Sequence, residues 1–139
     1  MNKRSFLKSL GLMAATGPLF SLDFAKENAN TTLLPKALLR GQTVGIISPS
    51  AASADRMEYT FAKEAMEAMG LKVKLGTNFK NRYGHLAGTD EERAADFNAM
   101  FADPEVKAIV CLRGGSGAAR ILPLIDYEKV KVNPKPLLG

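Results

Sequence analysis

Two apolar runs constrain the fold of this 139-residue chain more than any other feature of its sequence. The first, Thr43–Ile47, is bounded by Gly41 and Pro49, and the second, Ala108–Leu112, belongs to a strand expected from Val106 onward. A strand with one solvated face alternates apolar and polar residues, whereas a strand covered on both faces is apolar throughout. The two runs therefore predict buried strands of a parallel sheet.

The segments around these runs alternate between helical and strand patterns. Residues 57–69 and 90–102 carry apolar side chains at helical spacing, and residues 71–75 alternate apolar residues with lysine, which is typical of a half-exposed strand near a sheet edge. Residues 133–139 lead towards a further strand. This βαβαβαβ order predicts an α/β fold, a parallel sheet with helices on both faces. We expect a flavodoxin-like N-terminal domain, residues 41–139, that is incomplete at its C-terminal end.

Local signals refine the two predicted helices. The apolar stripe of the first helix is expected to face the core, and it consists of Phe61, Ala65, Met66 and Met69. Ahead of the second helix, Thr89 and Glu92 have the spacing of a capping box, in which each side chain accepts from the other residue's backbone N–H. This capping explains the acidic triplet 90–92 without a metal ion.

The N-terminus has the layout of a signal peptide, which we place at residues 1–30. A basic start with Lys3, Arg4 and Lys8 precedes an apolar stretch, residues 10–22, that is too short to favour a stable membrane span. Lys3-Arg4 resembles a twin-arginine signal with lysine in first position, so both the Tat and the Sec route stay open. We expect an exported, periplasmic protein with a linker at residues 31–40. The alternative is an amphipathic N-terminal helix of a cytoplasmic protein.

Composition excludes several classes of site. The formal net charge is only +5, and no basic run interleaved with aromatic residues indicates nucleic-acid binding. The chain has one cysteine, Cys111, and one histidine, His85, so an intrachain disulfide is excluded and these two residues alone cannot form a zinc site, which needs about four ligands. We expect no metal and no organic cofactor, and Cys111 is interpreted as a small buried apolar residue. A homodimer is left open.

A glycine-rich loop, residues 113–120, follows the second buried strand and reads Arg-Gly-Gly-Ser-Gly-Ala-Ala-Arg. Such a loop can cradle a phosphate, present backbone N–H donors to an oxyanion, or let the chain turn tightly. The dinucleotide fingerprint fails because Arg120 takes its third glycine position, and no P-loop sequence is present. A nucleophile elbow centred on Ser116 is an imperfect match, because Ala118 replaces its final glycine.

Several ordered stretches resemble the LD-carboxypeptidase family, which includes the microcin-immunity peptidases. Residues 41–50 are similar to its opening strand and loop, residues 84–93 to its Gly-His-Leu-Ala-Gly-Thr-Asp segment, and residues 108–120 to its strand and Arg-Gly-Gly-Tyr-Gly loop. Residues 134–139 resemble the lead-in to its Gly-Tyr-Ser-Asp nucleophile elbow. The family usually has tyrosine where this chain has Ser116, so an aromatic substrate contact is replaced there.

This resemblance implies a serine peptidase that hydrolyses the L,D-peptide bond of peptidoglycan tetrapeptides, releasing D-alanine from a muropeptide. The catalytic Ser, Glu and His would then follow Gly139, so the 139-residue chain is interpreted as an inactive fragment. We expect Gly115 and Gly114 to contribute to the oxyanion hole, and Arg113 and Ser116 to contact substrate. The rival hypothesis is an exported α/β module that binds a ligand in the same crevice without catalysis.

Overall fold

The computed structural model describes residues 33–139. The predicted signal peptide, residues 1–30, lies outside the described residues, as do the first two positions of the predicted linker. Residues 33–39 form neither helix nor strand. Within residues 33–139, no helix is both long and apolar enough to cross a membrane.

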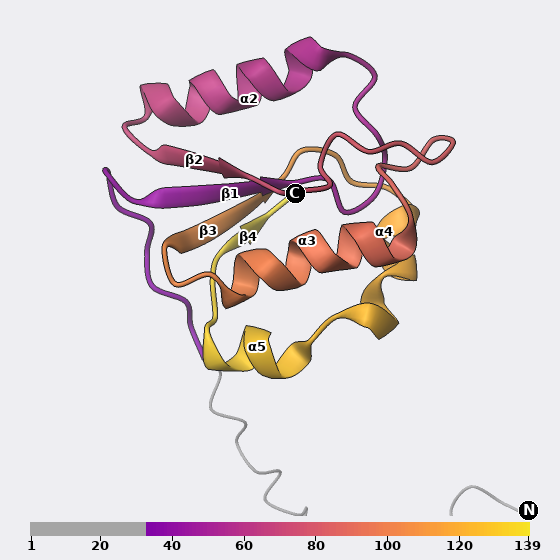
Figure 1. Cartoon of the computed structure of the whole chain (residues 1–139). Coiled ribbons are helices and arrows are strands. Elements are labelled where there is room, and N and C mark those ends of the chain that lie inside the picture. The colour runs from indigo at the N-terminus through magenta and orange to yellow at the C-terminus, as the bar shows by residue number, and fades with distance from the viewer. Residues whose placement is uncertain (1–32) are drawn as a thin grey trace, which may run out of the picture. The chain divides into compact units, whose positions relative to one another are not determined.

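A four-stranded parallel sheet organises the described chain (Figure 1). Its strands are β1 (Thr43–Ile47), β2 (Lys72–Leu75), β3 (Val106–Cys111) and β4 (Leu137–Leu138), in the spatial order β2-β1-β3-β4. This order corresponds to the first four strands of flavodoxin-like sheets. The predicted α/β class is confirmed, and β2 lies at the sheet edge with the alternating exposure expected from its sequence.

Helices cover both faces of the sheet, as predicted (Figure 1). Helix α2 (Arg56–Ala68) packs on one face, and helices α3 (Asp90–Ala102) and α5 (Tyr127–Val132) lie on the other. The short helix α4 (Gly117–Arg120) and the 3-10 turn η1 (Leu122–Leu124) connect β3 to α5. Each βα connection therefore opens at the carboxyl edge of the sheet, where ligands of open α/β folds bind.

The main hydrophobic core lies between α3 and the sheet. Its buried members are Ile47, Phe97, Met100, Phe101, Val106 and Ile109. Half-buried Cys111 packs against this cluster, and burial raises the pKa of its thiol. The side chain is therefore neutral over the physiological pH range and acts as the small apolar residue that was expected.

The predicted inward orientation of the α2 stripe is wrong. Phe61 is 60% exposed and Met69 49% exposed, Ala65 is also exposed, and only Met66 is half-buried. Helix α2 contacts mainly β2 at the edge of the sheet, and it turns Tyr59 against Phe79 with 5.7 Å between ring centroids. Apolar residues occur on more than one side of this helix, so their spacing alone did not determine which side is buried.

The predicted capping box at the start of α3 is confirmed. The Glu92 backbone N–H donates to Thr89 Oγ1 at 3.3 Å, and the Thr89 backbone N–H donates to Glu92 Oε2 at 2.8 Å. Because the box fixes the first turn of α3, it also fixes the orientation of the residues that this turn directs towards the loops at the carboxyl edge.

Candidate functional site

The glycine-rich loop after β3 lies against the loop after β1, because β1 and β3 are adjacent parallel strands. A Cβ atom at Gly115 would stand 3.0 Å from the Ser50 hydroxyl, and one at Gly117 would stand 2.9 Å from the same oxygen and 2.5 Å from Leu86. Ser50 is buried at 1% exposure. The close approach of these two loops therefore requires glycine at position 117 and leaves little space at position 115.

The backbone at Gly114 and Gly115 presents available donors. Gly115 has φ +130°, a conformation that residues with a side chain rarely adopt, and both glycines are exposed. Within residues 33–139, no hydrogen bond uses the N–H of Gly114 or of Gly115. The loop thus combines unshielded N–H groups with a position at the carboxyl edge, which are two requirements of an oxyanion hole.

Arg113, at the start of this loop, is held by a carboxylate of α2. Its Nε donates to Glu58 Oε2 at 2.8 Å, and its Nη2 donates to Glu58 Oε1, so the contact is bidentate. The Ser53 hydroxyl donates to the same carboxylate at 2.6 Å. Glu58 and Arg113 lie 55 positions apart in the sequence, and no sequence pattern identified Glu58 as part of the site. The only local signal was an acidic residue in the first turn of a helix, which the helix dipole already explains.

A second arginine, Arg93 of α3, connects three loops from the interior. Its Nη1 donates to the carbonyl oxygens of Pro49 at 2.6 Å and Gly117 at 2.7 Å, and its Nε donates to that of Gly88 at 3.3 Å. Its Nη2 forms an ion pair with Asp90. The Arg93 side chain is fully buried, so these contacts hold the loops after β1 and β2 and the glycine-rich loop after β3 together.

Arg93 was not among the residues predicted to be functional from the sequence. A signal was present, because position 93 lies beside Ala94 on the side of α3 that also carries Phe97, and this side is buried. A charged residue on the apolar side of a helix is rarely buried without partners. The partners, however, are carbonyl groups of loops, which the sequence pattern of α3 does not show.

Ser116 does not have the geometry of a nucleophile elbow. It precedes α4 with helical backbone angles, φ −61° and ψ −24°, whereas an elbow places its serine on a strained turn. His85 lies exposed in another loop, and the described residues show no hydrogen bond between it and Ser116. Over residues 33–139, no group of three or more His, Cys, Asp or Glu side chains is arranged to hold a metal ion.

Comparison with known proteins identifies the domain to which this site belongs. Residues 44–139 match the family described as the LD-carboxypeptidase N-terminal domain. The chain belongs to the LD-carboxypeptidase family. The glycine-rich loop, the Glu58–Arg113 pair and Arg93 are therefore features of an LD-carboxypeptidase N-terminal domain.

Two curated relatives are named as murein carboxypeptidases. A probable murein peptide carboxypeptidase of Bacillus subtilis is 47% identical over 105 residues, which are 76% of this chain and 33% of the relative. The murein tetrapeptide carboxypeptidase of Pseudomonas aeruginosa is 38% identical over 98 residues, which are 69% of this chain and 31% of the relative. The chain thus spans about a third of the length of these relatives.

Solved structures of the family share the fold. The microcin C7 self-immunity protein MccF, in complex with aspartyl sulfamoyl adenosine, superposes with a TM-score of 0.73 at 29% identity, covering 77% of this chain and 32% of MccF. A muramoyltetrapeptide carboxypeptidase from Oxalobacter formigenes gives a TM-score of 0.62 at 27% identity, covering 69% of this chain and 32% of that protein.

The ion pair of this LD-carboxypeptidase domain gives a direct pH prediction. Hydrogen bonds from Arg113 and then from Ser53 lower the pKa of Glu58 from 4.5 to about 2. A depressed carboxyl pKa stabilises the fold above the unfolded value, and this contribution is lost as the pH falls from about 4.5 through about 2. An acid titration followed by the NMR shift of the Glu58 carboxyl carbon should therefore give a midpoint near 2.

Arg113→Gln tests the cause of that shift. The substitution removes the guanidinium, and the Glu58 midpoint should move back towards 4.5. Arg120→Gln is the control, because Arg120 pairs with Asp90 and leaves Glu58 untouched. An unchanged Glu58 titration in Arg113→Gln would mean that the pair does not form in solution.

Proposed function

We propose that the full-length protein containing this domain is a serine carboxypeptidase that removes terminal D-alanine from peptidoglycan tetrapeptides. The family match carries this proposal, and the names of the curated relatives support its substrate class. The reaction is hydrolysis of an L,D-peptide bond by a serine nucleophile, without a metal ion or an organic cofactor. Its biological setting would be the recycling or remodelling of the cell wall.

Sequence identity favours a muropeptide over the substrates of the immunity peptidases. The two relatives named for murein are 47% and 38% identical to the chain, whereas MccF of Escherichia coli is 30% identical over 109 residues. MccF has been crystallised with an aminoacyl sulfamoyl nucleoside, so such compounds are the competing substrates to test.

In this proposal the glycine-rich loop forms part of the oxyanion hole. When the serine attacks, negative charge develops on the carbonyl oxygen of the scissile bond, and preorganised N–H donors stabilise that charge. The N–H groups of Gly115 and Gly114 are exposed and have no partner in the described chain. The absence of side chains lets the substrate carbonyl approach them closely.

Arg113 and Ser116 are assigned different roles. The Ser116 hydroxyl lies exposed on the loop, so we retain it as a substrate contact. Arg113 is bound bidentately by Glu58, and a substrate carboxylate would have to compete with that contact. We therefore propose that Arg113 chiefly positions the loop. It contacts substrate only when its guanidinium binds Glu58 and a substrate carboxylate at the same time.

The catalytic Ser, Glu and His are proposed to follow Gly139 in the full-length protein. Strand β4 runs parallel to β3, and Gly139 lies beside Cys111 at the carboxyl end of β3. A nucleophile placed two positions after Gly139 would therefore emerge at the same edge as the glycine-rich loop. We also propose that residues 1–30 direct the protein out of the cytoplasm to the periplasm.

Release of D-alanine from a purified tetrapeptide is the decisive measurement. We expect the full-length protein to release it in the presence of a metal chelator. We expect the 139-residue chain to release none, because the triad is proposed to follow Gly139. Failure of the full-length protein on the tetrapeptide, together with hydrolysis of an aminoacyl sulfamoyl nucleoside, would reassign the substrate. Activity of the 139-residue chain that is abolished by Ser116→Ala would relocate the nucleophile.

A further inference from the structure

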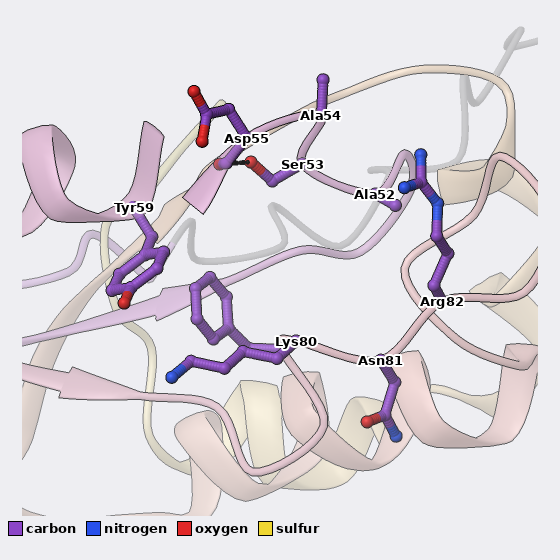
Figure 2. Close-up of a pocket in the computed structure, with 9 residues that line it drawn as sticks. Ala52, Ser53, Ala54, Asp55, Tyr59, Lys80, Asn81 and Arg82 are labelled. Atoms are coloured by element: carbon purple, nitrogen blue, oxygen red, sulfur yellow. Dashed lines mark hydrogen bonds between the residues drawn. The ribbon is translucent and has the colours of Figure 1, made fainter. Parts of the chain in front are cut away.

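A cavity of about 450 Å³ lies beside the proposed catalytic loop and has no part in the chemistry described so far. Three segments line it: residues 52–55 after β1, Tyr59 of α2, and residues 79–82 after β2 (Figure 2). It opens at the carboxyl edge of the sheet, on the side of β1 away from β3. Ser53 lines the cavity, and its hydroxyl donates to Glu58, the carboxylate that binds Arg113.

Two cationic side chains on the cavity wall have no acidic partner within residues 33–139. The Lys80 Nζ lies 5.0 Å from the centroid of the Tyr59 ring, and the Arg82 Nε donates to the Gly84 carbonyl oxygen at 3.2 Å. Neither residue forms an ion pair in the described chain, and both are exposed. Their charges are therefore available to a ligand.

The acidic residues nearby are already engaged. One Asp55 carboxylate oxygen accepts the Met57 backbone N–H at the start of α2, at 3.1 Å. Glu58 is bound by Arg113 on the other side of Ser53. Asp55 is the single acidic residue among those lining the cavity, against two cationic ones, so the wall favours an anion.

One side of the cavity is aromatic. Tyr59 and Phe79 meet edge to face, with an interplanar angle of 81°, and Phe79 is buried at 7% exposure. Figure 2 shows both the Tyr59 ring and the Lys80 side chain bordering the open space, with Arg82 on the opposite side. An aromatic wall of this kind favours the aliphatic part of a ligand, whereas the two cations favour a negatively charged group on it.

We propose, on the basis of the function proposed above, that this cavity binds a carboxylate of the peptide substrate away from the scissile bond. The ligand is an acidic residue on an aliphatic frame. Its carboxylate lies at the end of the cavity lined by Arg82, and its carbon chain extends towards Tyr59 and Phe79, where Lys80 adds a second positive charge beside the Tyr59 ring. Ser53 of the cavity wall donates to Glu58, which binds Arg113 at the start of the glycine-rich loop, and no residue of that loop lines the cavity, so binding and chemistry occupy neighbouring but distinct positions.

The test uses the full-length protein and two forms of a tetrapeptide, one with its side-chain carboxylates free and one with them amidated. With the acidic peptide, the double variant Lys80→Gln/Arg82→Gln should raise KM by about 10-fold or more at unchanged kcat, because the lost contacts bind substrate and transition state equally. With the amidated peptide, the variant and the wild type should have the same KM.

The matched control removes the same charge elsewhere. Lys72→Gln/Lys131→Gln alters one lysine at the amino end of β2 and one on α5, both exposed and outside the cavity lining. The wild-type KM should persist in this control. An equal rise of KM in both double variants would attribute the effect to general electrostatics and overturn the subsite.

Calorimetric titration of the acidic peptide separates this inference from the proposed function, because binding does not require turnover. Binding that is weakened by Lys80→Gln/Arg82→Gln supports the subsite even if no D-alanine is released. Binding that is unchanged in the double variant, or that is equally weakened for the amidated peptide, overturns it. Inorganic phosphate serves as a further probe. If the substitutions weaken the binding of phosphate but not that of the peptide, the cavity is a phosphate site instead.

Discussion

Gly115→Val in the full-length protein should lower kcat by about 10²–10³-fold, the usual cost of losing one oxyanion donor. Valine cannot adopt the φ of +130° found at Gly115 without strain, and its Cβ would stand 3.0 Å from the Ser50 hydroxyl. The loop must therefore rotate. In the proposed oxyanion hole, the N–H groups of Gly114 and Gly115 would then turn away from the scissile carbonyl oxygen of the substrate. KM should change much less, because the donors act mainly in the transition state.

Gly41→Val is the matched control for backbone strain. Gly41 also has a positive φ, +83°, but a Cβ there meets no atom within 4 Å, and the residue precedes β1 at the opposite end of the strand. The substitution imposes a comparable strain, on the order of 1–3 kcal/mol, far from the loop. Its kcat should stay near that of the wild type. If Gly115→Val folds and retains full turnover, the glycine-rich loop serves only as a tight turn.

The parallel sheet was predictable because its signals are local. The buried strands β1 and β3 are almost entirely apolar, the edge strand β2 alternates, and the capping box at Thr89 requires only residues within one helical turn. Such patterns survive in any tertiary context that covers the sheet on both faces. The position of the glycine-rich loop at the carboxyl edge followed from the same strand order.

The contacts that join the glycine-rich loop and the loop after β1 to other elements could not be predicted, since they connect residues far apart in the sequence. Glu58 meets Arg113 across 55 positions, and Arg93 reaches the Pro49 carbonyl across 44. A carboxylate in the first turn of α2 has the same sequence pattern whether it interacts with the helix dipole or with an arginine of another loop. The cavity is formed by three separate segments, and no single segment carries a recognisable motif.

Arg93→Met should lower the free energy of unfolding by about 3–5 kcal/mol, the range found when one partner of a buried charged network is removed. Methionine approximates the length of the arginine stem but donates no hydrogen bonds. The carbonyl groups of Pro49 and Gly117 then lose their donor in a buried position, and Asp90 loses one of its two arginine partners. Urea denaturation of the 139-residue chain, followed by circular dichroism, measures the loss.

Arg120→Met provides the comparison that isolates burial. Arg120 pairs with the same Asp90, at 2.9 Å, but its side chain is 59% exposed, and exposed ion pairs contribute roughly 0–1 kcal/mol. The loss of unfolding free energy in Arg93→Lys should lie between those of Arg93→Met and Arg120→Met. A single ammonium group keeps the charge but cannot span the carbonyl groups that the guanidinium reaches. Equal losses in Arg93→Met and Arg120→Met would show that the three loops hold their positions without Arg93, and that the glycine-rich loop is preorganised by its glycines and by the Glu58–Arg113 pair alone.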